Sequence, residues 1–156
     1  MSRGERRAAA RLAAVQALYQ MDVAKKGINE ILAEFESHWI GQEVEGDQYK
    51  PAEVAFFRAI LEGVLAEQAE VDVLVDRALS QGWPLRRVEA VLRAILRAGA
   101  YELLNRKDVP ARVAITEYTD LAGAFFAGDE VGMVNGVMDT LARRLRPDEL
   151  AGTARA

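Results

Sequence analysis

The residues best suited to chemistry are four arginines near the amino terminus. Arg3, Arg7 and Arg11 are four residues apart, which places them on one face of a helix, and Arg6 lies beside that face. A guanidinium makes bidentate, charge-assisted hydrogen bonds to phosphate oxygens. The spacing therefore predicts a stripe that attracts a phosphate chain. A solvated charged face is the plainer alternative.

Charge is segregated along the chain in a way that fits this prediction. Residues 1–26 contain six basic and two acidic side chains, a net charge of +4, whereas the whole chain carries −4. The remainder therefore carries −8, and more than half of its acidic residues lie between residues 27 and 76. A basic segment on an acidic protein can still bind a polyanion locally.

Patterns typical of catalytic and metal sites are missing from the sequence. The chain has one histidine, His38, and no cysteine, which excludes Cys–His catalysis and cysteine-based zinc sites. It has no phosphate-binding loop, no dinucleotide-binding glycine pattern and no serine in a nucleophile elbow. We therefore expect a protein that is not an enzyme and uses no cofactor or metal. His38 is interpreted as a surface or packing residue.

Two other features have both a structural and a functional interpretation. Asn135-Gly136 lies inside a helical pattern, where a glycine costs about 1 kcal/mol. This cost favours close packing against another backbone, with contact to a partner as the alternative. Glu89 and Arg93 are four residues apart, which favours a simple stabilising pair on one helix.

The elements that must position these residues are all helices. Apolar residues recur at helical spacing and no sustained alternation occurs, which predicts an all-α protein of about seven helices. In the first helix, Leu12, Val15 and Tyr19 share one apolar stripe. Helices are expected from Arg3 to Lys25, from Asn29 to a polar loop at 41–50, from Pro51, from Val71 to Leu79, through Val88–Leu103, through Val113–Phe125, and from Asp129 to near Pro147.

The chain is expected to form a single domain over residues 1–156, with residues 152–156 as a frayed tail. A break near Gly82–Pro84 divides the helices into two halves. No stretch of about 18 apolar residues predicts a membrane span, and the charged amino terminus is unlike a secretion signal. The absence of cysteine fits a reducing compartment, so we expect a cytoplasmic protein.

Several segments together resemble the NusB family of bacterial transcription antitermination factors. They are residues 11–20 (RLAAVQALYQ), residues 88–97 with 99–104 (VEAVLRAILR and GAYELL), residues 108–110 with 113–115 and Glu117, and residues 134–137 (VNGV) with Asp139. Each segment alone is weak, but their order and separation agree over roughly residues 3–146.

This resemblance implies an all-helical fold of two small packed bundles. It also implies that the protein binds boxA-type single-stranded RNA together with the ribosomal protein NusE, within the transcription elongation complex, and supports ribosomal RNA transcription. The residues implied for RNA are Arg3, Arg6, Arg7, Arg11, Asp129, Met133 and Asn135. Those implied for the surface that binds NusE are Tyr19, Trp83 and Glu89.

The chain departs from the family pattern at two places near the expected RNA surface. Ala8, Ala9 and Ala10 interrupt the arginine run, and Gly132-Met133 stands where a Lys-Phe is common. Two alternatives therefore stay open. One is a protein–protein scaffold or homodimer with weakened RNA binding, and the other is a stand-alone relative of the amino-terminal domain of ribosomal RNA cytosine methyltransferases.

Overall fold

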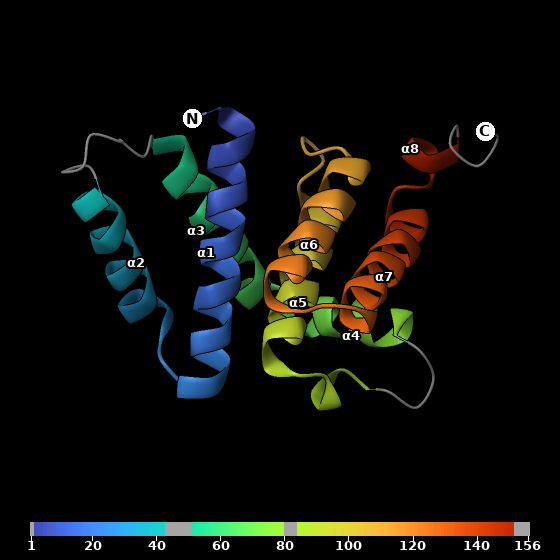
Figure 1. Cartoon of the computed structure of the whole chain (residues 1–156), viewed down its shortest axis with the longest axis horizontal. Helices are drawn as coiled ribbons and strands as arrows, with labels where there is room; N and C mark the ends of the chain where they lie inside the picture. Colours follow the sequence, from blue (N-terminus) through green and yellow to red (C-terminus); the bar gives the residue numbers. More distant parts are fainter. Residues whose placement is uncertain (1, 43–50, 80–83, 152–156) are drawn as a thin grey trace. The chain divides into compact units, whose positions relative to one another are not determined.

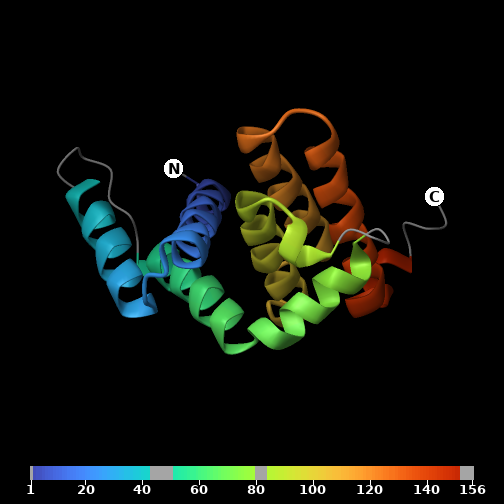
Figure 2. The same cartoon turned by 90° about the horizontal axis from the view of Figure 1, so that it is seen from below.

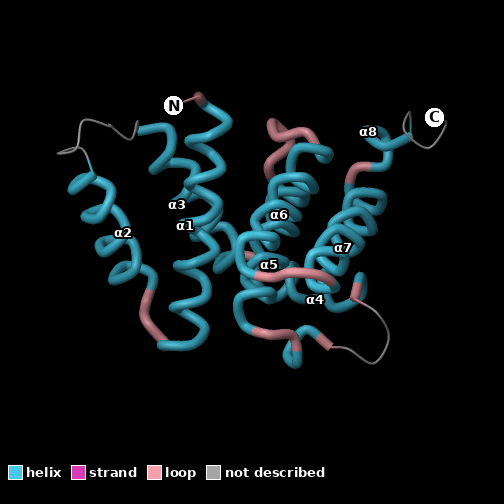
Figure 3. Tube along the Cα trace, viewed as in Figure 1, coloured by secondary structure: helices cyan, strands magenta, loops and turns pink. Residues whose placement is uncertain are grey.

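The computed structural model describes residues 2–42, 51–79 and 84–151 (Figure 1). Over these ranges the chain forms eight α-helices, one short 3-10 helix and no strand (Figure 3). The all-α prediction is confirmed, with one more helix than expected. The elements are α1 (Arg3–Ala24), α2 (Ile28–Gln42), α3 (Pro51–Ala66), α4 (Gln68–Ala78), η2 (Leu85–Arg87), α5 (Ala90–Asn105), α6 (Ala111–Phe125), α7 (Asp129–Leu145) and α8 (Pro147–Ala151).

The chain divides into two compact units between Ala66 and Glu67. The first contains α1 to α3 and the second contains α4 to α8, which confirms the two helical bundles. The boundary lies earlier than the predicted break at Gly82–Pro84, because α4 packs against α5 and α7. That the two units form a single domain stays a prediction.

In the first unit, α1 packs mainly against α3 (Figure 2). A capping box starts α1: the Glu5 amide donates to Ser2 Oγ at 3.1 Å, and the Glu5 carboxylate accepts from the Ser2 amide. Phe57 of α3 stacks on Phe35 of α2 with 5.5 Å between ring centroids. Val15 is buried as expected, but Leu12 is 36% exposed and does not belong to the buried face.

In the second unit, α5, α6 and α7 pack against one another around Gly99. A Cβ added at Gly99 would lie 2.5 Å from the Met138 sulfur and 3.3 Å from Tyr118, so a larger residue at this crossing would have to displace the buried end of Met138. Arg97 of α5 makes a bidentate ion pair with Asp72 of α4, at 2.7 and 3.0 Å. Two apolar residues predicted in α6, Val113 and Phe125, are more than 40% exposed.

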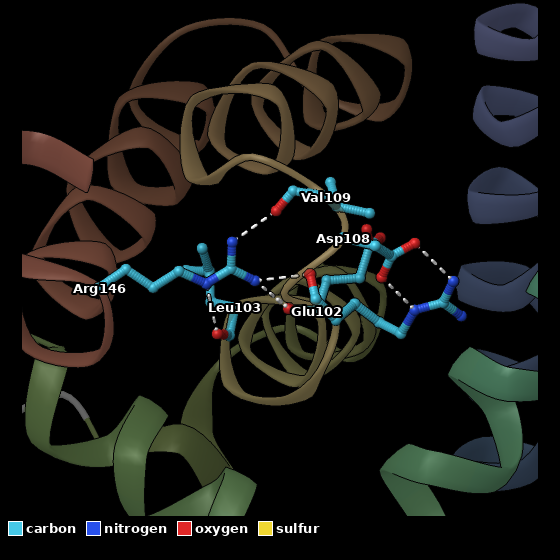
Figure 4. Close-up of polar contacts among 6 residues, drawn as sticks. Glu102, Leu103, Asp108, Val109 and Arg146 are labelled. Carbon is cyan, nitrogen blue, oxygen red and sulfur yellow. Dashed lines mark hydrogen bonds and ion pairs between the residues drawn. The ribbon is translucent and has the colours of Figure 1, made fainter. Parts of the chain in front are cut away.

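Arg146 holds the end of α5 in place. This side chain, 4% exposed, lies between α7 and α8. Its guanidinium donates to the carbonyls of Glu102, Leu103, Arg106 and Val109 (Figure 4). The last carbonyls of a helix lack a full set of partners within it, so a buried helix end needs such donors. Arg146 therefore supplies them from a distant part of the chain.

Glu149 of α8 completes this arrangement. Its carboxylate accepts from the Ala111 amide at 2.8 Å, in the first turn of α6, and from Arg146 at 3.1 Å. The hydrogen bond from the Ala111 amide lowers the pKa of Glu149 most, and Arg146 lowers it further. Together they outweigh desolvation, which raises this pKa. α7 ends at Leu145, near Pro147 as predicted, but this proline opens one further helix, α8, which the sequence did not predict.

Among the helices of the described ranges, none has the length and apolar character needed to cross a membrane.

Candidate nucleic-acid interface

The first two turns of α1 carry three arginines that solvent reaches. Arg3 is exposed, and Arg6 and Arg7 are partly exposed. The Ser2–Glu5 capping box orders the turn that holds them. The amino-terminal end of a helix is already positive, so cations there cost a few tenths of a kcal/mol and anions are favoured. This end of α1 is therefore suited to a phosphate chain.

Arg11 does not belong to that accessible surface. Its side chain is 2% exposed, and its Cζ lies 5.0 Å from the centroid of the Phe56 ring. The Cζ of Arg7 lies 4.4 Å from the same centroid. The expectation that Arg11 contacts RNA directly does not fit this burial, because a covered guanidinium does not reach a phosphate. We assign Arg11 to the core of the first unit.

The face of α1 that carries the arginines runs from solvent into the core. Arg7, Arg11, Ala14 and Leu18 follow the alternating four- and three-residue spacing of one helix face, and the last three are buried. Neither a solvated face nor a fully accessible stripe describes this arrangement. The spacing was visible in the sequence, but the partner ring on α3 was not.

The start of α7 presents the other predicted RNA residues. Asp129 and Asn135 are exposed, and Met133 is partly exposed. Asp129 is the first residue of α7, and Gly128, with a φ of 97°, occupies the cap position. Asp129 is thus in the first turn of α7 and is not its N-cap.

The glycines of α7 lie on an open surface. A Cβ added at Gly132 or Gly136 would meet nothing within 4 Å. The prediction that Gly136 packs closely against another backbone is therefore wrong. The helix retains two residues of low helix propensity at positions where the surrounding structure does not require them. The other interpretation given for the sequence, contact with a partner, explains these glycines better.

The residues expected to face NusE lie on separate parts of the fold. Tyr19 is partly exposed on α1 in the first unit. Glu89 belongs to the second unit and is the N-cap of α5, where its carboxylate accepts from the amides of Val91 and Leu92 at 3.1 and 3.3 Å. Trp83 lies outside the described residues, as does the side chain of His38.

In place of the predicted pairing of Glu89 with Arg93 along one helix, the two side chains bond to different backbone groups. Glu89 precedes α5 and caps its first amides, while Arg93 donates to the Val88 carbonyl at 2.8 Å. The Leu85 amide donates to Asp76 at 2.8 Å, which fixes the turn η2 just before this cap. Glu89 therefore has a structural role besides any role at a protein surface.

A cluster of three or more acidic, histidine or cysteine side chains that could hold a metal ion does not occur within residues 2–42, 51–79 and 84–151. Of the predicted RNA residues that solvent reaches, those of α1 are guanidiniums, and those of α7 include the carboxylate of Asp129 and the amide of Asn135. This set suits hydrogen bonding to phosphates and base edges.

The family model described as the NusB family matches residues 8–143. The chain belongs to the NusB family. A protein of a Bradyrhizobium species named transcription antitermination protein NusB is 64% identical over 148 residues, which cover 95% of this chain and 88% of that protein. A Rhodopseudomonas palustris protein of the same name is 62% identical over 149 residues, 96% of this chain and 88% of that protein.

Solved NusB structures share the fold described above. T. maritima NusB is 28% identical, with a TM-score of 0.78 over 93% of this chain and 96% of that chain. A structure of NusB and NusE in complex with dsRNA contains a chain that is 23% identical, with a TM-score of 0.72 over 92% of this chain and 99% of that chain. At this identity the second likeness shows the NusB fold alone.

Proposed function

We propose that this chain is an RNA-binding transcription antitermination factor. It binds boxA-type single-stranded RNA together with the ribosomal protein NusE, acts within the transcription elongation complex and supports ribosomal RNA transcription. The observation that carries the proposal is the match to antitermination proteins over nearly the whole chain at more than 60% identity. It acts in the cytoplasm and without catalysis of its own.

The arginines at the start of α1 bind the phosphates of the RNA. Arg3, Arg6 and Arg7 are accessible to different degrees on an ordered helix end. Phosphate contacts fix the position of the strand but carry no sequence information. A few such contacts give weak binding that falls as salt is added. The acidic remainder of the chain explains why a second protein is needed to hold the RNA.

The start of α7 contacts the bases of the RNA. Single-stranded RNA exposes base edges, so an accessible carboxylate and amide can hydrogen-bond to them. Asp129 accepts from amino groups, Asn135 both donates and accepts, and Met133 offers an apolar contact to a base. Gly132 and Gly136 leave room for the RNA to approach the helix backbone. Tyr19, Glu89 and Trp83 are the residues that we propose for contact with NusE.

Neither sequence-based alternative is favoured. The curated relatives that match over nearly the full chain are antitermination proteins, which argues against a methyltransferase-derived domain and against a pure scaffold. Titration of labelled boxA RNA, with and without NusE, tests the proposal. We expect NusE to tighten binding and a scrambled RNA to bind less well. Equal binding of both RNAs, or no effect of NusE, would refute it.

A further inference from the structure

The ring of Phe56 is shared by two arginines of α1. The Cζ atoms of Arg7 and Arg11 lie 4.4 and 5.0 Å from its centroid, both within the range of about 6 Å for a cation–π contact. Phe56 itself is 2% exposed, so its ring is fixed by the packing of α3 against α1. The position of the ring therefore fixes where these guanidiniums lie.

The two arginines, Arg7 and Arg11, differ in their exposure to solvent. Arg11 is 2% exposed, whereas Arg7 is partly exposed. A free arginine side chain loses conformational freedom when it binds a phosphate. A side chain already held over a ring has less freedom to lose, so it binds the same phosphate more tightly. Of the two, only Arg7 combines such restraint with access to solvent.

We propose that Phe56 is a positioning residue for RNA binding. Its ring holds the Arg7 guanidinium in the conformation that binds a phosphate, while Arg11 packs against the same ring from within the core. The proposal rests on the proposed function, because it takes RNA to be the anion that Arg7 binds. It adds a buried residue of α3 to the determinants of RNA affinity.

The neighbouring residue offers a matched control. Phe57 follows Phe56 on α3, is equally buried, and stacks on Phe35 of α2. Phe56→Leu and Phe57→Leu each remove one buried ring from the same helix. Only the first removes the ring beneath Arg7. A loss of RNA affinity caused by general loosening of the core would follow either substitution.

The test is the affinity for labelled boxA RNA in the presence of NusE. We expect Phe56→Leu to weaken binding about three- to tenfold, the effect of ordering one long side chain. Phe57→Leu should stay within about twofold, and Phe56→Tyr, which keeps the ring, should bind like the unchanged chain. In a chain that already carries Arg7→Ala, Phe56→Leu should have no further effect.

Several outcomes would overturn the inference. Equal losses for Phe56→Leu and Phe57→Leu, or additive effects of Phe56→Leu and Arg7→Ala, would show that the ring does not act through Arg7. If Phe56→Leu fails to fold, Arg7→Lys keeps the charge without the planar group and should still weaken binding about three- to tenfold. Unchanged affinity for Arg7→Lys would overturn it too. An unchanged chain that shows no salt-dependent RNA binding would refute the proposed function, and this inference with it.

Discussion

The Nε of Arg146 donates a hydrogen bond of 2.9 Å to the carbonyl oxygen of Leu103, a residue 43 positions earlier in the chain. The same guanidinium serves three other carbonyls and the carboxylate of Glu149. One side chain thus joins the end of α5, the turn that follows it and α8. The helix that presents Asp129 and Asn135, α7, leads directly into the segment that Arg146 holds.

Arg146→Met should destabilise the protein strongly. The carbonyls of Glu102 and Arg106 keep backbone donors, the amides of Arg106 and Val109, whereas those of Leu103 and Val109 lose the donor that Arg146 supplies. Each such buried carbonyl costs about 1–3 kcal/mol, so a loss of about 3 kcal/mol or more in the free energy of unfolding is expected. Urea unfolding followed by circular dichroism measures it. Arg144→Met, an exposed position two residues earlier, should change stability by no more than about 0.5 kcal/mol. Similar losses for both variants would contradict the role of Arg146.

Glu149 should make stability depend on pH in the acid range. Its folded pKa is lowered from 4.5, chiefly by the Ala111 amide, so its contribution is present above the ordinary pKa and is lost as pH falls through the lower folded value. The stability difference between the unchanged chain and Glu149→Gln should therefore be largest near neutral pH and shrink as the pH falls below 4.5. Asp120→Asn, the same chemical change on the exposed side of α6, is the control. A difference that stays constant with pH would count against this assignment.

Gly99→Ala should destabilise the second unit by about 1–2 kcal/mol, because the new methyl group overlaps Met138 and crowds Tyr118 in a packed core. Gly123→Ala is the matched control. A Cβ there meets nothing within 4 Å, so the gain in helix propensity should stabilise the protein by up to about 1 kcal/mol. Thermal unfolding of both variants measures the contrast. Combining Gly99→Ala with Met138→Val should recover part of the loss, and no recovery would argue against the predicted overlap.

Substitutions at Arg3 and Arg11 should affect different properties, RNA binding for Arg3 and stability for Arg11. Arg3→Ala should lower the slope of log affinity against log salt by about 0.7, the value for one phosphate contact on a single strand, with little change in stability. Arg11→Met should lower the free energy of unfolding by about 1–3 kcal/mol and leave the salt slope unchanged, since Arg11 is buried. Salt titrations and urea unfolding on both variants give the two readouts. A lower salt slope for Arg11→Met with unchanged stability would show that Arg11 contacts the RNA.

Glu89 requires substitutions that separate capping from partner binding. Asparagine is a strong N-cap without charge, so Glu89→Asn should keep the stability of α5 and weaken binding to NusE. Glu89→Ala should weaken binding and also cost about 1 kcal/mol of stability. Binding measured by calorimetry, beside thermal unfolding, distinguishes the two effects. Full NusE affinity in Glu89→Asn would place the partner surface elsewhere.

The helical fold could be predicted because it depends on local signals. Pro51 begins α3 as expected, and the apolar periodicity of α5 corresponds to its buried face. Pro147 shows the limit of such signals, since a proline both ends one helix and starts another. The helix that starts at Pro147 is held by contacts of Arg146 and Glu149 with residues about forty positions away, which no local pattern contains.

The candidate site was predictable by residue type but not by environment. Spacing groups Arg3, Arg7 and Arg11 on one face, yet it does not say which turn of that face meets α3. Burial of Arg11 depends on Phe56, and a pattern within one helix carries no information on a ring from another. The same limit explains Gly136, whose surroundings come from the fold and not from its own helix.

The joint at Arg146 and Glu149 also has a consequence for synthesis on the ribosome. Translation adds both residues after α4 to α7 have been made, so until then the Leu103 carbonyl and the Ala111 amide lack the hydrogen bonds that Arg146 and Glu149 provide. The second unit therefore acquires its full stability only after α8 has been made. Nascent chains stalled before Arg146 would be good substrates for chaperones and proteases.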